Sequence, residues 1–420
     1  MLLQFTTLFT TLLLLLQGAK SLVYENKVYE PEIKTVQLYG AKTDPRAELL
    51  PAVAALRQND LVLEFDDLRY DHESYYVRVI HCNYDWTPSR LRDLDFISEY
   101  NEFVINDYAF SSNTVIPYVH YKFKVPNVKI PGNYLLVVYR DGNKSDLVLS
   151  QRFMAFDNRT SILQDNQSIG SINLRLTNQQ LNFTLNYKGL EIVNPFESVH
   201  VVIRQNQRWD NAKYNVKPSF VREDRKQIEY RFFDEDKYFN AGNEFRFIDF
   251  RSINFPGQNT DRIDKAAKPF HLWIQKDKSR LGDSYAQYLD LNGQYYIENL
   301  DYNSDDEITS DYIDVTMTLA SPPLANGKVY TVGAFNNYRR TAENEMTYQK
   351  ALGAYEFTTR LKQGWYDYQY LAVSDQQEPY YFEGSHYETE NFYEIFVYYR
   401  PFQPDADLLI GYFPITINQR

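Results

Sequence analysis

The stretch Tyr75–Ser89, which reads YYVRVIHCNYDWTPS, decides how this part of the chain folds. It begins as a run of aromatic and β-branched residues, which suit the pleated and half-buried surface of a strand. The run then enters a polar and aromatic corner, HCNYDW, which ends at Thr87 and Pro88. The pattern indicates a β-sheet with a decorated corner and shows no feature of an active site.

Two more strands are predicted after this corner. Over Val115–Val125 the apolar and aromatic residues take one side of a two-residue period, while His120 and its polar neighbours take the other. Pro131 and Gly132 form a turn signal, because proline presets the first turn angle and glycine accepts a positive one. Tyr134–Arg140 then reads as the next strand.

The composition favours an all-β protein. The chain has 420 residues, which predicts two to four domains. Aromatic residues make up 16% of it and 37 of them are tyrosines. Such residues are enriched in strands, so the excess argues for sheets over helices.

The charge balance argues against nucleic-acid binding. The 44 basic and 56 acidic side chains give a formal net charge of −12. An acidic chain repels phosphate backbones, and no dense basic run offsets this repulsion. We therefore expect no nucleic-acid partner.

Cys82 is the only cysteine, so disulfides cannot stabilise the fold. It ends a predicted strand, where a small buried thiol is favoured over a catalytic one. His81 is adjacent, but neighbouring strand residues point to opposite faces, which argues against a Cys–His couple.

Residues 1–21 are predicted to be a secretory signal peptide. Leu12–Leu16 form its apolar core, and small residues follow where cleavage would occur. The apolar stretch is too short to cross a membrane comfortably, and no later run reaches that length. We expect an exported, soluble protein without a membrane span.

The rest of the chain divides into three predicted immunoglobulin-like β-sandwiches, residues 22–156, 157–304 and 305–420. Ile313–Leu319 alternates cleanly with polar residues and gives one of the clearest strands.

Several individual elements are also predicted. Thr87–Leu94 reads as a short helix. Ile172–Leu176 and Leu181–Tyr187 alternate on either side of a polar turn and predict a hairpin. Tyr393–Arg400, which ends before Pro401, reads as the last strand.

No constellation of residues predicts catalysis, a cofactor or a metal. The six histidines show no metal-binding spacing, and nucleophile and phosphate-binding motifs are lacking. Asp301–Glu307 begins like a calcium loop, but Asp306 stands where glycine is required and Tyr312 where the bidentate glutamate belongs. An acidic linker is the favoured reading of this stretch.

An ordered set of motifs covers nearly the whole mature chain. In chain order they are Ile80–Ser89, Ile105–Tyr108 followed by Pro117–Tyr121, Arg208–Ala212, Gly242–Arg246, and Gly384–Asn391 followed by Tyr398–Phe402. This set resembles the plug protein of the Bacteroidetes type IX secretion system.

The resemblance implies a non-enzymatic periplasmic protein. It would occlude the periplasmic opening of a large outer-membrane β-barrel translocon while no substrate is exported. The conspicuous polar and aromatic residues are candidates for a partner interface or a structural corner, in which Asp85 caps a turn and Trp86 seals a sandwich end. These candidates are His81, Asn83, Asp85, Trp86, Trp209 and His386.

A second, partial resemblance concerns the last predicted domain. Val329–Tyr338 and Gly364–Tyr370 are similar to the early-set immunoglobulin module used for starch and glycogen binding. Such modules stack sugars on exposed tryptophans, but Tyr338 stands where tryptophan is usual. Trp365 would supply a platform, or it is a core or rim aromatic. The alternative function is therefore an envelope carbohydrate-binding or scaffolding protein.

Overall fold

The computed structural model describes residues 20–40, 46–56, 58, 60–165, 174–231, 237–302 and 305–419. Its regular structure is almost entirely β-strand, which confirms the predicted all-β class. Nearly all of the predicted signal peptide lies outside the described residues.

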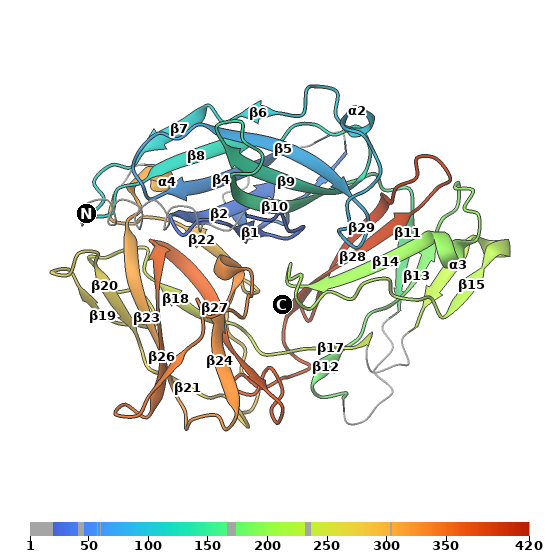
Figure 1. Ribbon diagram of the computed structural model, residues 1–420. Coiled ribbons are helices and arrows are strands. Elements are labelled where there is room, and N and C mark those ends of the chain that lie inside the picture. The colour runs from blue at the N-terminus through green and yellow to red at the C-terminus, as the bar shows by residue number, and fades with distance from the viewer. Residues whose placement is uncertain are drawn as a thin grey trace, which may run out of the picture.

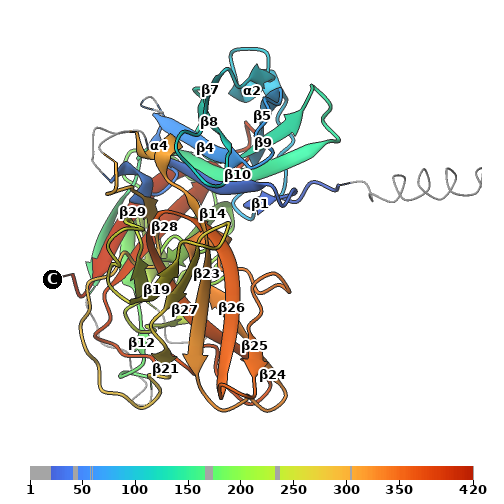
Figure 2. The same cartoon turned by 90° about the vertical axis from the view of Figure 1, so that its left-hand side faces the viewer.

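Two sheets pack face to face in the N-terminal sandwich, which lies across the ends of the other two sandwiches in both views (Figures 1 and 2). Their strand orders are β1-β10-β9-β5-β6, with β3 parallel to β10, and β2-β4-β8-β7. The elements are β1 (Lys27–Val28), β2 (Ile33–Gly40), η1 (Ala47–Leu49), β3 (Val53–Ala55), β4 (Leu61–Asp67), β5 (Tyr75–Cys82), α2 (Asp93–Phe96), β6 (Phe103–Val104), β7 (Asp107–Phe110), β8 (Val119–Lys124), β9 (Gly132–Arg140) and β10 (Leu147–Phe156).

The predicted strand that begins at Tyr75 forms as β5. Tyr75, Val77 and Val79 are fully buried in the N-terminal core. The short helix predicted over Thr87–Leu94 is misplaced, because a single helical turn forms further along the chain, at α2. Residues after the corner fold back on the end of β5 instead, and the amide of Ser89 donates to the carbonyl of His81 at 3.0 Å.

The middle sandwich packs the sheet β11-β13-β16-β15 against the sheet β14-β28-β29. The last two strands of the chain therefore complete a sandwich that begins near residue 161. The elements are β11 (Ser161–Asp165), β12 (Asn178–Gln179), β13 (Asn182–Asn186), α3 (Pro195–Ser198), β14 (Val199–Gln205), β15 (Phe220–Arg222), η2 (Glu223–Arg225), β16 (Gln227–Tyr230), β17 (Phe239–Asn240), β28 (Asn391–Tyr399) and β29 (Leu408–Ile417).

The third sandwich packs a sheet centred on β27 against the sheet β19-β20-β23-β26-β25. In the first of these, β18, β22 and β24 all pair with β27. The elements are β18 (Arg246–Asp249), β19 (Thr260–Asp264), β20 (His271–Ile274), β21 (Asp277–Lys278), β22 (Tyr295–Ile297), α4 (Asp306–Thr309), β23 (Tyr312–Ala320), β24 (Gly327–Val332), η4 (Ala334–Asn336), β25 (Thr347–Gln349), β26 (Ala354–Lys362) and β27 (Gly364–Ser374).

Strand pairing crosses the boundary expected between residues 304 and 305. β14 pairs with β28 along its whole length, and β18 pairs with β27. The middle and third sandwiches are thus interleaved along the chain, whereas the boundary at residue 156 coincides with the end of β10.

Two predicted elements of the middle and C-terminal parts are wrong. The hairpin partner Ile172–Leu176 falls partly outside the described residues, and the rest of it is a turn in which Leu176 is 71% exposed. The neighbour of β13 is instead β11. The strand before Pro401 is also not the last one, because β29 follows it. Within β29, Pro414 lies opposite Glu394.

Candidate functional site: the junction of the three sandwiches

The corner after β5 joins the N-terminal sandwich to the middle one. Within the corner, Asp85 Oδ1 accepts hydrogen bonds from the amide and hydroxyl of Thr87, at 3.0 and 2.6 Å. Across the joint, Arg400 donates to the side-chain oxygen of Asn83 at 2.8 Å, and the amide of Tyr84 donates to Asp407 at 3.0 Å. The corner is therefore held by contacts more than 300 residues away in sequence.

His81 and Cys82 are both buried in this joint. His81 is 1% exposed, and a Cβ on Gly132 would lie 2.4 Å from its Nε2, so only glycine fits there. Burial lowers the pKa of His81 to about 4 and raises the pKa of Cys82 to about 12. A neutral imidazole beside a protonated, buried thiol is a poor basis for nucleophilic chemistry.

The structure brings Trp86 and Trp209 together. Their rings meet edge to face with centroids 5.0 Å apart, and Trp86 is only 2% exposed. The Arg152 guanidinium lies 4.4 Å from the Trp86 centroid and 5.2 Å from that of Trp209, and Arg204 lies 4.4 Å from the Trp209 centroid. These contacts join β10 of the N-terminal sandwich to β14 of the middle one through cation–π interactions.

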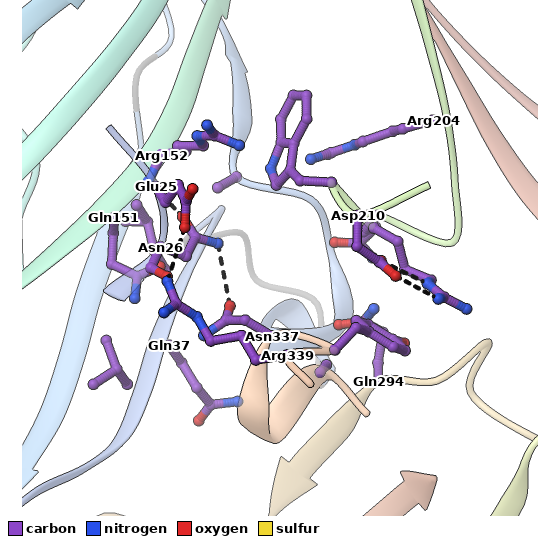
Figure 3. Close-up of a pocket in the computed structure, with 18 of the residues that line it drawn as sticks. Glu25, Asn26, Gln37, Gln151, Arg152, Arg204, Asp210, Gln294, Asn337 and Arg339 are labelled. Carbon is purple, nitrogen blue, oxygen red and sulfur yellow. Dashed lines mark hydrogen bonds and ion pairs between the residues drawn. The ribbon is translucent and has the colours of Figure 1, made fainter. Parts of the chain in front are cut away.

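A cavity of about 600 Å³, here called the junction cavity, is lined by Trp209, Arg152 and Arg204 (Figure 3). Its walls come from all three sandwiches, and Arg152 and Arg204 enter it from different strands. The polar and charged lining residues labelled in Figure 3 are Glu25, Asn26, Gln37, Gln151, Arg152, Arg204, Asp210, Gln294, Asn337 and Arg339.

The arginines of this cavity were not singled out by sequence reasoning. Arg208 and Trp209 stood in a recognised motif, which was the available signal for that loop. Arg152 carried no signal, because its two tryptophan contacts come from distant segments whose pairing no local pattern encodes.

His386 lies outside the junction cavity. Its amide donates to the carbonyl of Gly242 at 2.8 Å, and its ring centroid is 5.8 Å from that of Tyr285. It thus belongs to the loops that connect the third sandwich with β28.

The two candidate sugar-stacking residues are held by protein contacts. Tyr338 is 4% exposed, and its hydroxyl donates to the carbonyl of Gly293 at 2.9 Å. Trp365 is half-buried and stacks on Phe247 with centroids 4.3 Å apart, while its Nε1 donates to Asp367 at 3.1 Å. A sugar platform needs a free ring face, so any glucan site here would depend on the remaining face of Trp365.

One group of side chains has metal-binding geometry: Glu64, His120 and Glu307 offer ligand atoms within 4.8 Å of one another. However, the Lys122 ammonium lies 2.6 Å from Glu64 and 2.7 Å from Glu307. Burial disfavours a charged His120, but hydrogen bonds to Asp66 and Glu307 outweigh this and raise its pKa to about 9. An ammonium and an imidazolium thus supply the positive charge that a metal would bring.

Comparison with known proteins agrees with this architecture. Residues 33–157 match the model of the "Type 9 secretion system plug protein 1st domain", which spans the N-terminal sandwich. The N-terminal sandwich is thus similar to the first domain of the type 9 secretion system plug protein family. The crystal structure of a hypothetical protein from Parabacteroides merdae ATCC 43184 has a TM-score of 0.87 and 28% identity to this chain. The match covers 94% of this chain and 100% of the other, whereas a search of curated proteins found no significant match.

The match of the N-terminal sandwich to the plug family indicates a role in type IX secretion and a location in the cell envelope. Together with the all-β fold, it indicates a structural rather than an enzymatic protein. In the part of the chain that the structure describes, no helix combines the length and the apolar character needed to cross a membrane.

Proposed function

We propose that this protein is a periplasmic plug that occludes the periplasmic opening of the outer-membrane β-barrel translocon while no substrate is exported. The observation that carries the proposal is the family match over the N-terminal sandwich. A pore wide enough for folded cargo would leak small solutes if it stayed open, and a space-filling protein prevents that leak.

The way the sandwiches are joined suits an obstacle that must not deform. The third sandwich lies in the chain between β17 and β28, so two segments of chain connect it to the middle sandwich, which closes beyond it by the pairing of β14 with β28. A compact chain of this length has a radius of gyration of roughly 21 Å, hence a width on the order of 50 Å. Such a body would fill a wide aqueous opening.

An exposed aromatic patch on the family-matched sandwich is a candidate contact surface for the translocon. Tyr70, Tyr108 and Phe110 are 45%, 41% and 44% exposed. Their rings contact one another at the edge strand β7, with centroids 5.4 Å apart for Tyr70 and Phe110. Exposed aromatic clusters beside an open sheet edge are typical of protein interfaces, and a reversible plug needs an interface of moderate size with a polar rim.

Deletion of the gene tests the occlusion. We expect the outer membrane to become more permeable to small solutes while the translocon remains assembled, and complementation to restore the barrier. Unchanged permeability with an intact translocon would exclude the plug function.

Co-purification tests the contact surface. The double substitution Tyr108→Ser/Phe110→Ser is expected to reduce recovery of the translocon with the plug, whereas Phe402→Ser removes a 94% exposed aromatic at the turn between β28 and β29 and serves as the control. Equal recovery by both variants would place the contact on another face.

A further inference from the structure

The junction cavity has the size and position of a ligand site. Pockets that bind small molecules commonly enclose about 300–1,000 Å³ and lie between domains. At about 600 Å³, this cavity falls within that range and is walled by all three sandwiches. Occlusion of a pore does not require such a cavity, so its chemistry bears on a property beyond the proposed function.

The lining is unusually basic for a chain of net charge −12. Five arginines and three carboxylates line the cavity. Four of the arginines have a carboxylate partner. The pairs are Arg204–Glu394, Arg208–Asp210, Arg340–Asp210 and Arg339–Glu25, with N–O distances of 2.5, 2.8, 3.4 and 3.2 Å.

Arg152 is the exception. Among the described residues no carboxylate oxygen lies within 4.0 Å of its guanidinium. Its nitrogens donate instead to the carbonyl oxygen of Tyr24, at 2.8 and 2.5 Å, and the guanidinium contacts the rings of both Trp86 and Trp209. Burial lowers the pKa of Arg152, which shows that its charge is poorly solvated. Tyr214 and the more distant Glu25 offset part of this effect, but neither forms an ion pair with the guanidinium. A desolvated cation without a direct ion pair gains more from an added anion than a surface one does.

Two loops beside the cavity each contain two consecutive non-glycine residues with positive φ. Asn206 and Gln207 have φ values of 52° and 59°, and Asn337 and Tyr338 have 53° and 54°. Consecutive non-glycine residues in the left-handed region are costly, and such strain clusters at ligand-binding sites. Gln207, Asn337 and Tyr338 all line the cavity.

We propose that the junction cavity binds a small monocarboxylate that also carries hydroxyl or amide groups, with its carboxylate against Arg152. One unpaired guanidinium matches one negative charge, and its planar donors suit a carboxylate. The side-chain amides of Gln37, Gln294 and Asn337 line the cavity and provide further hydrogen-bonding groups (Figure 3). Tyr214, which is 38% exposed, offers an apolar ring.

Sugar acids and acylated amino acids share this chemistry. Calorimetric titration of the full-length mature protein with galacturonate and with N-acetylglutamine separates the two sources, and galactose serves as a neutral match for galacturonate. We expect at least one acid to bind with a millimolar or lower Kd, which corresponds to about −4 kcal/mol or stronger, and galactose to show no heat of binding. Lack of binding by both acids, or equal binding of galactose and galacturonate, would overturn the proposal.

Substitution then locates the site. Arg152→Gln removes the charge and is expected to weaken binding about tenfold or more, because a hydrogen bond to a charged group is lost. Arg222→Gln, which changes an exposed arginine that pairs with Glu229 on the middle sandwich, is the matched control and should bind as the wild type does. Thermal melting verifies that each variant is folded. If Arg152→Gln does not fold, Tyr214→Leu replaces it, and unchanged affinity in a folded variant of either kind contradicts the assignment.

Discussion

Asp66 on β4 and Lys362 at the end of β26 form a buried ion pair with an N–O distance of 2.7 Å, and it joins the N-terminal sandwich to the third one. Neither residue is more than 1% exposed. Asp66 also accepts hydrogen bonds from the Tyr312 hydroxyl at 2.6 Å and from His120 Nδ1 at 2.7 Å. Burial alone would raise the pKa of Asp66, but Lys362 and His120 outweigh it and lower that pKa. The carboxylate is therefore ionised and fully partnered.

Removing the lysine is expected to destabilise the protein strongly. Lys362→Met leaves Asp66 buried with one fewer cation, and breaking a buried pair in this way costs about 3–5 kcal/mol. The free energy of unfolding in urea measures the effect. Lys328→Met is the matched control, because Lys328 pairs with Glu345 at 2.6 Å on the surface, where such a pair is worth about 0–1 kcal/mol. Equal losses in the two variants would show that the buried pair does not hold the sandwiches together.

The same cluster predicts a pH dependence of stability. The pKa of His120 is about 9 in the folded protein against an ordinary value of 6.5. Because folding raises this pKa, protonated His120 stabilises the folded protein fully below pH 6.5, and this stabilisation is lost as the pH rises through 9. The groups that face His120 are Asp66, Glu64, Glu307, Lys122 and Lys362.

We therefore expect the melting temperature to fall between pH 6.5 and 9.5, and the fall to be smaller in His120→Gln. Glu307 affects the stability at acidic pH instead. Its pKa is lowered to about 2, chiefly by the hydrogen bond from His120, so its stabilisation is present above 4.5 and is lost as the pH falls through 2. An identical alkaline slope in wild type and His120→Gln would assign the titration to another group.

Local patterns in the sequence predicted individual strands well but not their partners. The predicted strand Ile313–Leu319 differs from β23 by one residue at each end, because alternation alone defines which residues face the core. Alternation did not reveal that β14 pairs with β28, or that Lys362 reaches Asp66, since these contacts depend on the path of the whole chain. Alternation also led to a wrong prediction at Leu176, which continues an alternating pattern but is exposed and lies in a turn.

In the candidate site, too, the sequence revealed some residues and not others. The aromatic corner was visible because Trp86 and Trp209 are rare residues in polar surroundings, and the structure brings them together. Arg152, which contacts both rings, is an ordinary residue in an ordinary strand and could not be identified without the fold.

A prediction for the carbohydrate alternative concerns Trp365. Its Nε1 and one ring face are already engaged by Asp367 and Phe247, so little of the ring remains for a sugar. We expect migration through a native gel containing glycogen to equal that through a gel without it. Retardation that disappears in Trp365→Ala, with an unchanged melting temperature, would establish a glucan-binding module.

The last prediction separates a structural role of the corner from an interface role. Trp86 is 2% exposed, packs against Trp209 and lies under the Arg152 guanidinium. Truncating a buried tryptophan costs about 3–5 kcal/mol, so Trp86→Ala should lower the melting temperature markedly. Phe402→Ala, which truncates an exposed aromatic at the β28–β29 turn, should leave it unchanged. If Trp86→Ala melts like the wild type but no longer retains the translocon in co-purification, the corner itself is the contact surface, and the aromatic patch at β7 is not required for it.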